Sequence, residues 1–433
     1  MIPNEPAVVN KGFGSLLKNR NFMLLWIGQL ISQMADKIFL ILTIDLLSVY
    51  LLNTQIPEEE GRFYLYAVST IPAILFGSIG GVIVDRMPKK PIMVGSDFIR
   101  GLLTLCLPFL PREFQVMLIV VFTISTVTQF FAPAEQAVIP MLVKRESLMA
   151  ANALFASTMM AALIVANATG HSLLLWAKSI SYSFGGELVV GGCYLLSALV
   201  MMPIYFKEHK HRDQETAVPN PWTEFVQGWR YLKKNRLVWN AMVQIVALYS
   251  VFAALLELSI RLAIKFHEQM QQLQIISPEE SDKQLGYTFF IAATGIGMVL
   301  GAGILGQFGY KLHRKPLPLI GFSIMAVALC LFTVIPNLPL ALGLCVFLGM
   351  GAAFVNVPMQ TLIQQNTPPA MHGKVFGFQN HAVNIALSAP LLITTKLVDQ
   401  LGLSIVLLGM SLLVASVGVW AWRSSRSVLQ DSI

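Results

Sequence analysis

The ten residues from Gly81 to Lys90 read Gly-Val-Ile-Val-Asp-Arg-Met-Pro-Lys-Lys. One apolar run, 64–85, leads into this stretch, and a second, 91–111, follows it. Each run is close to the roughly 20 residues that a helix needs to cross the hydrocarbon core of a bilayer. A charged turn between two such runs predicts a hairpin of two membrane-spanning helices.

The same alternation of long apolar runs and short charged turns extends over the whole chain. Of its 433 residues, 55% are hydrophobic and only 12% are charged, whereas soluble domains carry about 25% charged residues. Because so few charges cannot cover a surface that faces water, we expect most of the protein surface to face the lipid bilayer. Twelve spans are predicted, at 22–48, 64–85, 91–111, 115–137, 149–176, 188–206, 237–260, 285–308, 316–335, 338–361, 375–396 and 403–422.

The basic residues predict the orientation. With the N-terminus in the cytoplasm, inner segments hold about three times as many Lys and Arg as outer ones, and this bias places both termini inside. Because the basic residues lie in short loops, the net charge of +7 does not indicate a nucleic-acid partner. No signal peptide is visible in the first 20 residues. We therefore expect an integral membrane protein with both termini on the inner side.

No pattern in the sequence indicates an enzyme. The four cysteines lie in apolar runs, no His or Cys cluster has metal-ligand spacing, and no nucleotide-binding loop or nucleophile elbow occurs. We expect no metal and no cofactor. Any energy used should therefore come from an ion gradient.

The longest polar stretch, 207–236, divides the expected spans six and six. It contains an amphipathic run, 222–232, that predicts a short helix on the membrane surface. Two patterns recur across it at an offset of 225 residues: Pro88-Lys89-Lys90-Pro91 matches His313-Arg314-Lys315-Pro316, and Ala132-Pro133-Ala134-Glu135 matches Val357-Pro358-Met359-Gln360. These matches predict two related six-helix halves, 1–206 and 237–433, with a substrate site between them.

The opening stretch resembles the signature that the major facilitator superfamily carries between its second and third helices. Gly81 permits close helix approach, and Asp85 can accept from neighbouring basic groups or lie against a helix N-terminus. The resemblance implies a twelve-helix fold in which Gly81, Asp85, Arg86, Lys89 and Lys90 form a cytoplasmic gate. Pro88 stands where the family usually has glycine.

Two longer stretches resemble the drug-efflux branch, which includes macrolide-efflux and siderophore-exporter proteins. They are residues 130–154 and 356–377. Two positions depart from the branch pattern: Glu135 stands where a basic residue is common, and Gly170-His171 occurs where an antiporter motif has two glycines. The second departure leaves exchange transport an open question. The resemblance also implies a monomer in a bacterial inner membrane, but it carries no information on the substrate.

Asp36 is the strongest candidate for a functional group inside a span, with Lys37 beside it. Ionisable residues within spans are costly and tend to be functional. Gln29, Gln33 and Asp36 share one helix face, which suits a polar cavity wall. A buried carboxyl group can exchange a proton at moderate pH because burial disfavours its charged form. The alternative is an ion pair of Asp36 with a Lys or Arg that only fixes packing.

Asp97 and Arg100 are three residues apart and can meet on one helix face, either as a coupling pair or as a structural pair. We expect Glu135 to pair with basic loop residues as part of the cytoplasmic gate. Glu257 and Arg261, four residues apart, predict an ion pair at the outer end of the seventh span.

Two histidines complete the candidate set, because histidine titrates near neutral pH and could carry a proton. His171 lies in the fifth span, where a lone histidine is more often a packing residue than a proton carrier. His381 follows Gln379 and Asn380 in the eleventh span, and three adjacent polar residues favour a cavity wall.

The leading hypothesis is a secondary active exporter of amphipathic or hydrophobic small molecules, coupled to protons. A lysophospholipid or other lipid transporter is a second reading, because those relatives share some patterning in the first and fifth spans. A third is a receptor or assembly factor built on a carrier fold that transports nothing, since fold does not fix function.

Overall fold

The computed structural model describes residues 12–52, 54–181, 184–206, 221–266, 269–270, 283–312, 316–335 and 337–430. All regular secondary structure among these residues is helical. The longer helices are α2 (Arg20–Leu51), α3 (Glu58–Arg86), α4 (Lys89–Cys106), α5 (Phe114–Leu142), α6 (Leu148–Ile180), α7 (Gly185–Met201), α9 (Arg236–Lys265), α11 (Lys283–Leu312), α12 (Leu317–Leu331), α13 (Leu338–Asn366), α14 (His372–Leu401) and α15 (Leu403–Gln430). Two shorter helices are α1 (Phe13–Leu17) and α8 (Pro221–Lys234).

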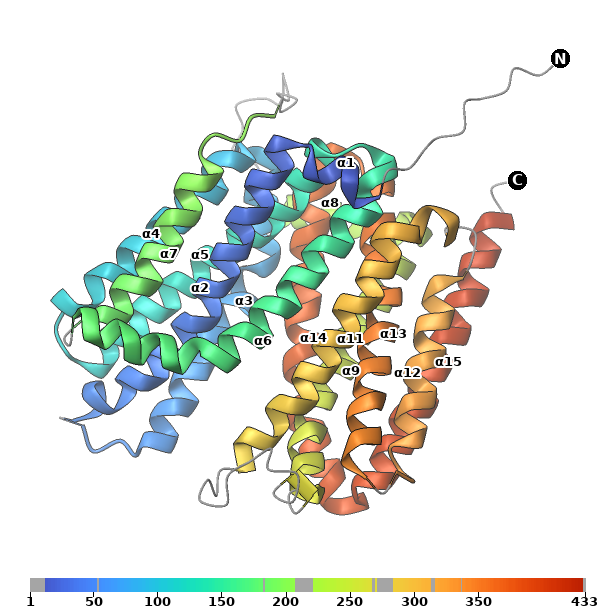
Figure 1. Cartoon of the computed structure of the whole chain (residues 1–433). Coiled ribbons are helices and arrows are strands. Elements are labelled where there is room, and N and C mark those ends of the chain that lie inside the picture. The colour runs from blue at the N-terminus through green and yellow to red at the C-terminus, as the bar shows by residue number, and fades with distance from the viewer. Residues whose placement is uncertain are drawn as a thin grey trace.

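These helices form two groups that lie side by side (Figure 1). The first group contains α2 to α7, coloured blue to green, and the second contains α9 and α11 to α15, coloured yellow to red. α1, α8 and the last turns of α15 lie at the same end of the bundle. We call this the α8 end and the opposite one the distal end.

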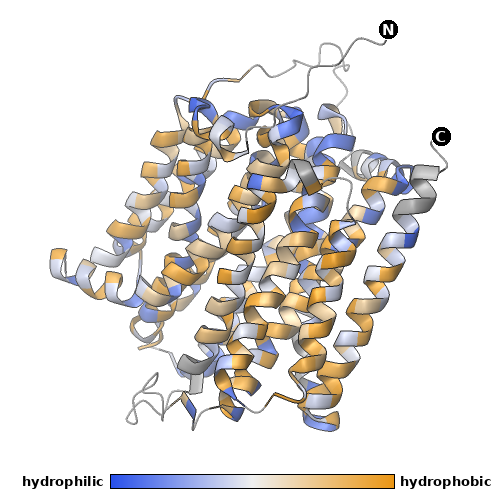
Figure 2. Ribbon diagram, turned by 45° about the vertical axis from the view of Figure 1, so that its right-hand side comes forward, coloured by the Kyte–Doolittle hydropathy of each residue, from blue (hydrophilic) through white to orange (hydrophobic). Residues whose placement is uncertain are grey.

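Eight of the described helical segments are long and apolar enough to cross a membrane, and α7 and α12 are shorter apolar helices. Apolar residues dominate the lengths of the helices, and hydrophilic residues gather toward the α8 end (Figure 2). The all-helical architecture expected from the sequence is confirmed.

Local signals explain where several helices begin and end. The side chain of Asn19 accepts a hydrogen bond from the Phe22 backbone N–H at 3.2 Å and so caps α2. α3 follows Pro57, and its first turn holds three glutamates, which favour the positive end of the helix dipole. α7 ends at Met201, before the predicted 206, because Pro203 follows and lacks a backbone donor.

Two other boundary predictions can be compared with the structure. The separation of the ninth and tenth spans is confirmed, because α12 ends at Leu331 and α13 begins at Leu338. The amphipathic run in the linker forms α8, as expected. The rest of the predicted linker, 207–220, lies outside the described residues.

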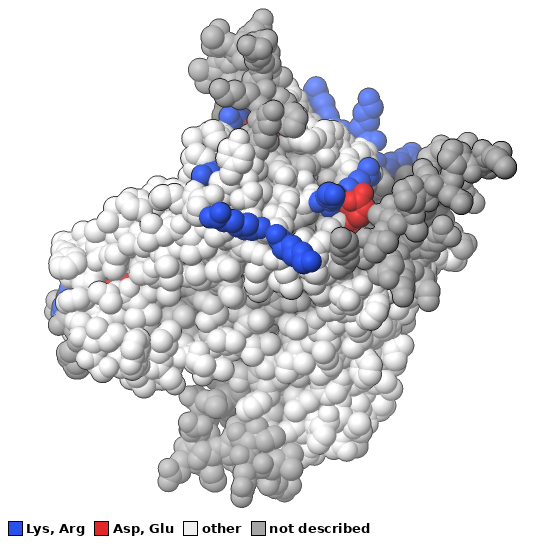
Figure 3. Space-filling model, turned by 45° about the horizontal axis from the view of Figure 1, so that its top comes forward, with Lys and Arg blue, Asp and Glu red and all other residues white. Residues whose placement is uncertain are grey.

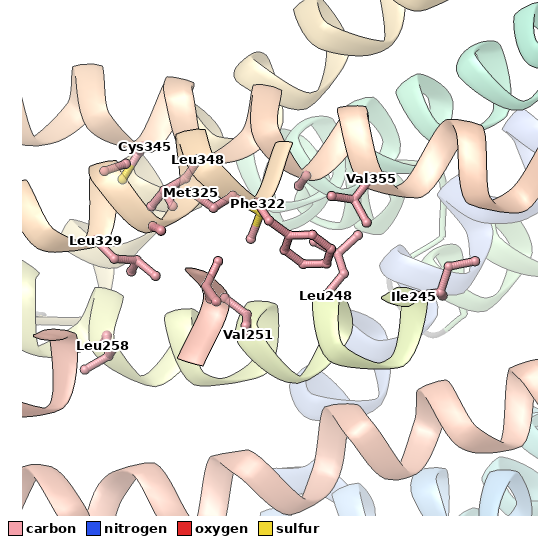
Figure 4. Close-up of a cluster of buried hydrophobic side chains, with 14 of the residues drawn as sticks. Ile245, Leu248, Val251, Leu258, Phe322, Met325, Leu329, Cys345, Leu348 and Val355 are labelled. Carbon is pink, nitrogen blue, oxygen red and sulfur yellow. The ribbon is translucent and has the colours of Figure 1, made fainter. Parts of the chain in front are cut away.

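Each group of helices has its own buried apolar core. In the second group, side chains from α9, α12 and α13 interdigitate, with Phe322 of α12 lying near Leu248 of α9 (Figure 4). Two further clusters, one around Tyr194 and one around Phe22, fill the first group. A smaller cluster of alanines and methionines joins α6 to α11 and α13, and so connects the groups.

The two groups approach most closely through glycines of α3 and α14. A Cβ added to Gly81 would lie 2.1 Å from the carbonyl oxygen of Gly373, and one added to Gly377 would lie 2.6 Å from the Cα of Gly81. No side chain larger than hydrogen fits this crossing without a shift. Gly81, Gly373 and Gly377 all lie in the half of their helix nearer the α8 end.

The α6–α11 contact is the counterpart of this crossing. A Cβ on Gly309 would lie 2.3 Å from the Met149 sulfur, and one on Gly306 would overlap the ring of Phe13 in α1. These contacts also lie at the α8 end. The groups are therefore joined there by two helix crossings, with α1 packed across one of them.

Lysine and arginine side chains gather on the face at the α8 end (Figure 3). The surface that extends from this face along the helices is uncharged over most of its visible area. A basic end beside an uncharged flank is typical of a helical membrane protein, in which the flank contacts lipid and the basic residues lie outside the hydrocarbon core.

Candidate functional site

Arg100 of α4 is the centre of a buried polar network inside the first group of helices. Its side chain has no exposed surface. Nη1 donates to Asp36 Oδ1 of α2 at 2.9 Å, while Nη2 donates to Asp97 Oδ1, one turn earlier in α4. The predicted meeting of Asp97 and Arg100 on one face is confirmed.

Aromatic rings and hydroxyl groups complete the surroundings of Arg100. Its guanidinium carbon lies 4.6 Å from the centre of the Phe131 ring and 4.9 Å from that of Tyr194, distances typical of cation–π contacts. Thr128 of α5 accepts from Nη1 at 3.4 Å. Helices α2, α4, α5 and α7 therefore meet at one cation.

The carboxylate of Asp97 is fully enclosed and receives hydroxyl donors besides the guanidinium. Ser32 of α2 donates to Oδ1 at 3.1 Å, and Ser197 of α7 donates to Oδ2 at 2.5 Å. A buried ionised carboxylate requires such donors, because an unpaired charge inside a membrane protein is very costly. Asp97 therefore has the surroundings of a fixed, ionised group.

Asp36 lies at the edge of the network rather than inside it. It accepts from Arg100 and from the Tyr194 hydroxyl at 2.7 Å, yet 23% of its side chain is exposed. Of the residues predicted to form a stripe with it, Gln33 is half-buried and Gln29 is buried. Asp36 thus connects a sealed ionic core to a more open helix face.

Lys37 lies on the more open face of α2 and is half-buried. It forms no hydrogen bond or ion pair with any residue in the described part of the chain. On the same helix, Ile41 packs against Gly170 of α6, and Asp45 accepts from Lys178 of α6 at 2.8 Å. Lys37 and Gln33 therefore occupy the sector of α2 between its α6 contacts and the Arg100 network.

A row of amides crosses between the two groups of helices. Asn380 of α14 donates to Gln129 of α5 at 2.9 Å, and Gln360 of α13 donates to Gln136 of α5 at 3.4 Å. Gln379 of α14 extends the row by donating to Gln360 at 2.5 Å. The structure thus places Gln379 and Asn380 at the contact between the groups.

Asp85 forms a latch between α3 and the N-terminus of α14. Its two carboxylate oxygens accept from the backbone N–H groups of Gly373, at 2.5 Å, and Lys374, at 2.9 Å. Of the partners expected for Asp85, the structure therefore shows the helix N-terminus, where a negative charge is favourable. The basic residues of the same turn differ in exposure: Arg86 is exposed, Lys90 is half-buried, and Lys89 is buried with its amine 3.5 Å from the Asp85 carbonyl.

The remaining predicted residues are dispersed. Glu135 lies in the interior among Asp97, Arg100 and Asp36, and not beside the loop residues expected as its partners, because that face of α5 points to α4. His171 is exposed on α6. His381 is half-buried, with its backbone against Gly77 of α3.

Glu257 and Arg261 form the expected pair, with 3.7 Å between Oε1 and Nε. Arg261 also binds Asp399 of α14 at 2.7 Å. All three residues belong to the second group, so this cluster ties α9 to α14 near the distal end. It does not itself cross between the groups.

Sequence reasoning missed the partners that complete the site. Tyr194 and Ser197 occur in an apolar run of α7, where nothing marks them as ligands of a carboxylate. Gln129 and Gln136 are seven residues apart on α5, a spacing that places both on one helix face and could have drawn attention to them.

Asn152 of α6 was also missed. It donates to Thr361 at 3.0 Å and to Gln364 at 2.7 Å, both on α13. This is a further polar contact between the groups at the α8 end.

The arrangement described so far is that of a helical membrane transporter: two packed groups of helices, a polar seam between them, and a charge network beside the seam. The chain belongs to the Major Facilitator Superfamily, whose family model matches residues 25–391. It is an integral, multi-pass membrane protein and a transporter, not an enzyme.

Known relatives refine this assignment. The chain is 25% identical over 326 residues to BacE of Bacillus subtilis, a protein named for bacilysin export, covering 74% of this chain and 76% of that protein. It is 24% identical over 401 residues to macrolide efflux protein A of Streptococcus pyogenes, covering 88% and 90%. The resemblance to the drug-efflux branch is confirmed.

A solved structure agrees with the fold. The Escherichia coli fucose:proton symporter superposes with a TM-score of 0.67 at 15% identity, covering 93% of this chain and 98% of that one. This similarity concerns the fold alone.

Proposed function

We propose that the chain is a secondary active exporter of amphipathic or hydrophobic small molecules that exchanges them for protons. Relatives named for macrolide efflux and bacilysin export support the direction and the kind of substrate. The observation that carries the proposal is the position of Asp36, which joins the sealed Arg100 network to the more open face of α2. A carboxyl group in that position can gain or lose a proton while its partner cation stays fixed.

In this proposal α2, α7, α12 and α14 also cross the bilayer, which gives twelve spans. Residues 1–206 and 237–433 form the two halves, joined by 207–236. The α8 end lies in the cytoplasm, with both termini, because basic residues gather there (Figure 3). The protein acts as a monomer in a bacterial inner membrane.

Transport proceeds by alternating access between the halves. The Gly81–Gly373 crossing, the Asp85 latch and the Asn152 contact close the α8 end in the present conformation. Opening that end requires these contacts to part. Gln33 and Lys37 lie on the wall that lines the path between the halves.

Protonation of Asp36 weakens its bond to Arg100, because a neutral carboxyl attracts a guanidinium less than a carboxylate does. Binding of substrate beside α2 and binding of a proton on Asp36 are then mutually dependent. This linkage is what exchange requires.

The test uses purified protein in liposomes that contain a trapped pH dye. Lipophilic cations, macrolides, siderophores and lysophospholipids are added in turn. We expect one class to trigger proton flux in the wild type and no such flux in Asp36→Asn, which is close in shape and should fold. The matched control is Asp45→Asn, which removes a carboxylate of the same helix that pairs with Lys178.

Each other outcome has a definite meaning. Flux that persists in Asp36→Asn removes the role of Asp36. Lysophospholipid movement that continues without a pH gradient would establish a lipid transporter instead. Absence of flux and of ligand movement with every compound would favour a receptor or assembly factor.

A further inference from the structure

Glu135 is a buried acid for which the network around Arg100 provides no partner. Only 7% of the residue is exposed, and its Oε1 atom is buried without a hydrogen-bond donor. It forms no ion pair or hydrogen bond with any residue that the structure describes. Glu135 lies one helical turn from Phe131, whose ring covers the Arg100 guanidinium, so it belongs to the same interior.

The charges around Glu135 do not balance. The groups that act on it electrostatically are Asp97 and Arg100 of α4 and Asp36 of α2. On α14, the ring of His372 lies near the backbone of Ala137 at the α8 end and does not act on Glu135. Among the described residues, α3, α6 and α13 bring no charged group that acts on it.

Three carboxyl groups therefore share one guanidinium. Both terminal nitrogens of Arg100 are already used, Nη1 by Asp36 and Nη2 by Asp97. With all three acids ionised, the cluster would carry two uncompensated negative charges in an interior where only Asp36 has appreciable exposed surface. Carboxylates that share a buried site do not all ionise together. At least one proton must reside on the cluster.

Glu135 is the position that accommodates this proton best. Asp97 already has a guanidinium and two hydroxyl donors, and Asp36 has a guanidinium and a phenol. Glu135 is the carboxyl group of the cluster whose buried oxygen, Oε1, has no donor. Protonation of Glu135 therefore removes the charge that has the least compensation.

We propose that Glu135 is a proton-binding site of the transporter, protonated while the α8 end is closed and deprotonated when that end opens. The proton passes between the carboxyl oxygen and water, and no other bond changes. Gln136, the next residue, is hydrogen-bonded to Gln360 of the other group. Parting of the groups at this bond uncovers the adjoining turn of α5, so water reaches Glu135 only in the open conformation. The link to exchange rests on the proposed function, whereas proton binding does not.

The test measures the proton directly, without substrate. Infrared difference spectra of purified protein between acid and alkaline buffer detect the stretching band of protonated carboxyl groups. Other carboxyl groups contribute to this band as well, so we expect one component of the wild-type band to be lost in Glu135→Gln and retained in Asp45→Asn. Glu135→Gln has the shape and neutrality of the protonated acid and should fold, and Glu135→Met serves as a second variant if it does not.

Two results would overturn the proposal: a band unchanged in Glu135→Gln, or a band lost in Asp36→Asn while Glu135→Gln retains it. The proposed function fails separately. If the band depends on Glu135 but no substrate moves protons in liposomes, the proton site stands and exchange does not. If substrate moves protons equally in the wild type and in Glu135→Gln, exchange stands and Glu135 has no part in it.

Discussion

Replacing Asp85 by asparagine tests the latch between α3 and α14. The carboxylate accepts two backbone N–H groups, one on each oxygen, at the positive end of α14. Asparagine keeps one acceptor oxygen, loses the charge, and turns an NH₂ group toward the second N–H. The variant should fold, because Asp85 is only half-buried and its own helix does not depend on it.

The loss can be estimated from the contacts. A hydrogen bond to a charged group contributes about 1.5–3 kcal/mol, and a charge at a helix terminus contributes about 0.3–1 kcal/mol. Since one hydrogen bond remains, we take the net loss as about 2 kcal/mol, which corresponds to a change of about 30-fold in an equilibrium constant. The equilibrium between closed and open α8 ends should shift by that factor toward the open form.

The assay is a distance distribution between two spin labels, one on each side of the latch. Met87 and Ala370 are exposed and lie beside Asp85 and the start of α14, respectively. Both are changed to cysteine in a protein whose four native cysteines have been replaced. The wild type should give mainly a short distance, and Asp85→Asn should add a population at longer distance.

Asp45→Asn is the control, because its partner Lys178 belongs to the same group of helices. It should leave the distance distribution unchanged. A distribution for Asp85→Asn identical to that of the wild type would refute the assignment of Asp85 as a latch. An equal shift in both variants would show that loss of any carboxylate loosens the fold.

Three further predictions concern the closed end and the ion network. Gly81→Ala should lengthen the spin-label distance at the α8 end, because the added methyl group overlaps the Gly373 carbonyl and such overpacking costs about 1–3 kcal/mol. The control Gly192→Ala, which has open space around the added methyl group, should leave this distance unchanged. Asn152→Ala should lengthen that distance too, because it leaves the buried amide oxygen of Gln364 on α13 without a donor, at a cost of about 1–3 kcal/mol. An unchanged distance would argue against this contact. Arg100→Met should lower the free energy of unfolding in detergent by about 3–5 kcal/mol, because it leaves the buried Asp97 and the half-buried Asp36 without their cation. An unchanged melting temperature would contradict that role.

Structural features that depend on residues close together in the sequence, such as helix positions and contacts within one helix, could be predicted. The apolar runs located the long helices, because a run of that length without charges has few alternatives in a bilayer. The spacing of Asp97 and Arg100 predicted their contact, because residues three apart share a helix face. From the sequence, Asp85 was expected to meet neighbouring basic groups or a helix N-terminus, and the structure shows it at the N-terminus of α14.

Properties that depend on how helices pack could not be predicted. Asp36 meets Tyr194 only because α7 lies beside α2, and the residues are 158 positions apart. The same limit applies to Glu135, for which the sequence predicted a loop partner. Which face of α5 points inward is decided by all the helices around it, and that face carries Glu135 toward Arg100.

Apart from the Asp85 latch, the hydrogen bonds described at the contact between the groups are made by neutral groups. Amides meet amides along α5, α13 and α14, and Asn152 meets a hydroxyl and an amide. A neutral amide that leaves its partner is satisfied by water without drawing counterions, so the contribution of these amides to closure should be nearly independent of salt concentration. Re-forming their hydrogen bonds likewise requires no dehydration of ions. The seam should therefore part and reform quickly, and the slow step of the cycle would lie in the movement of charge within the first group of helices.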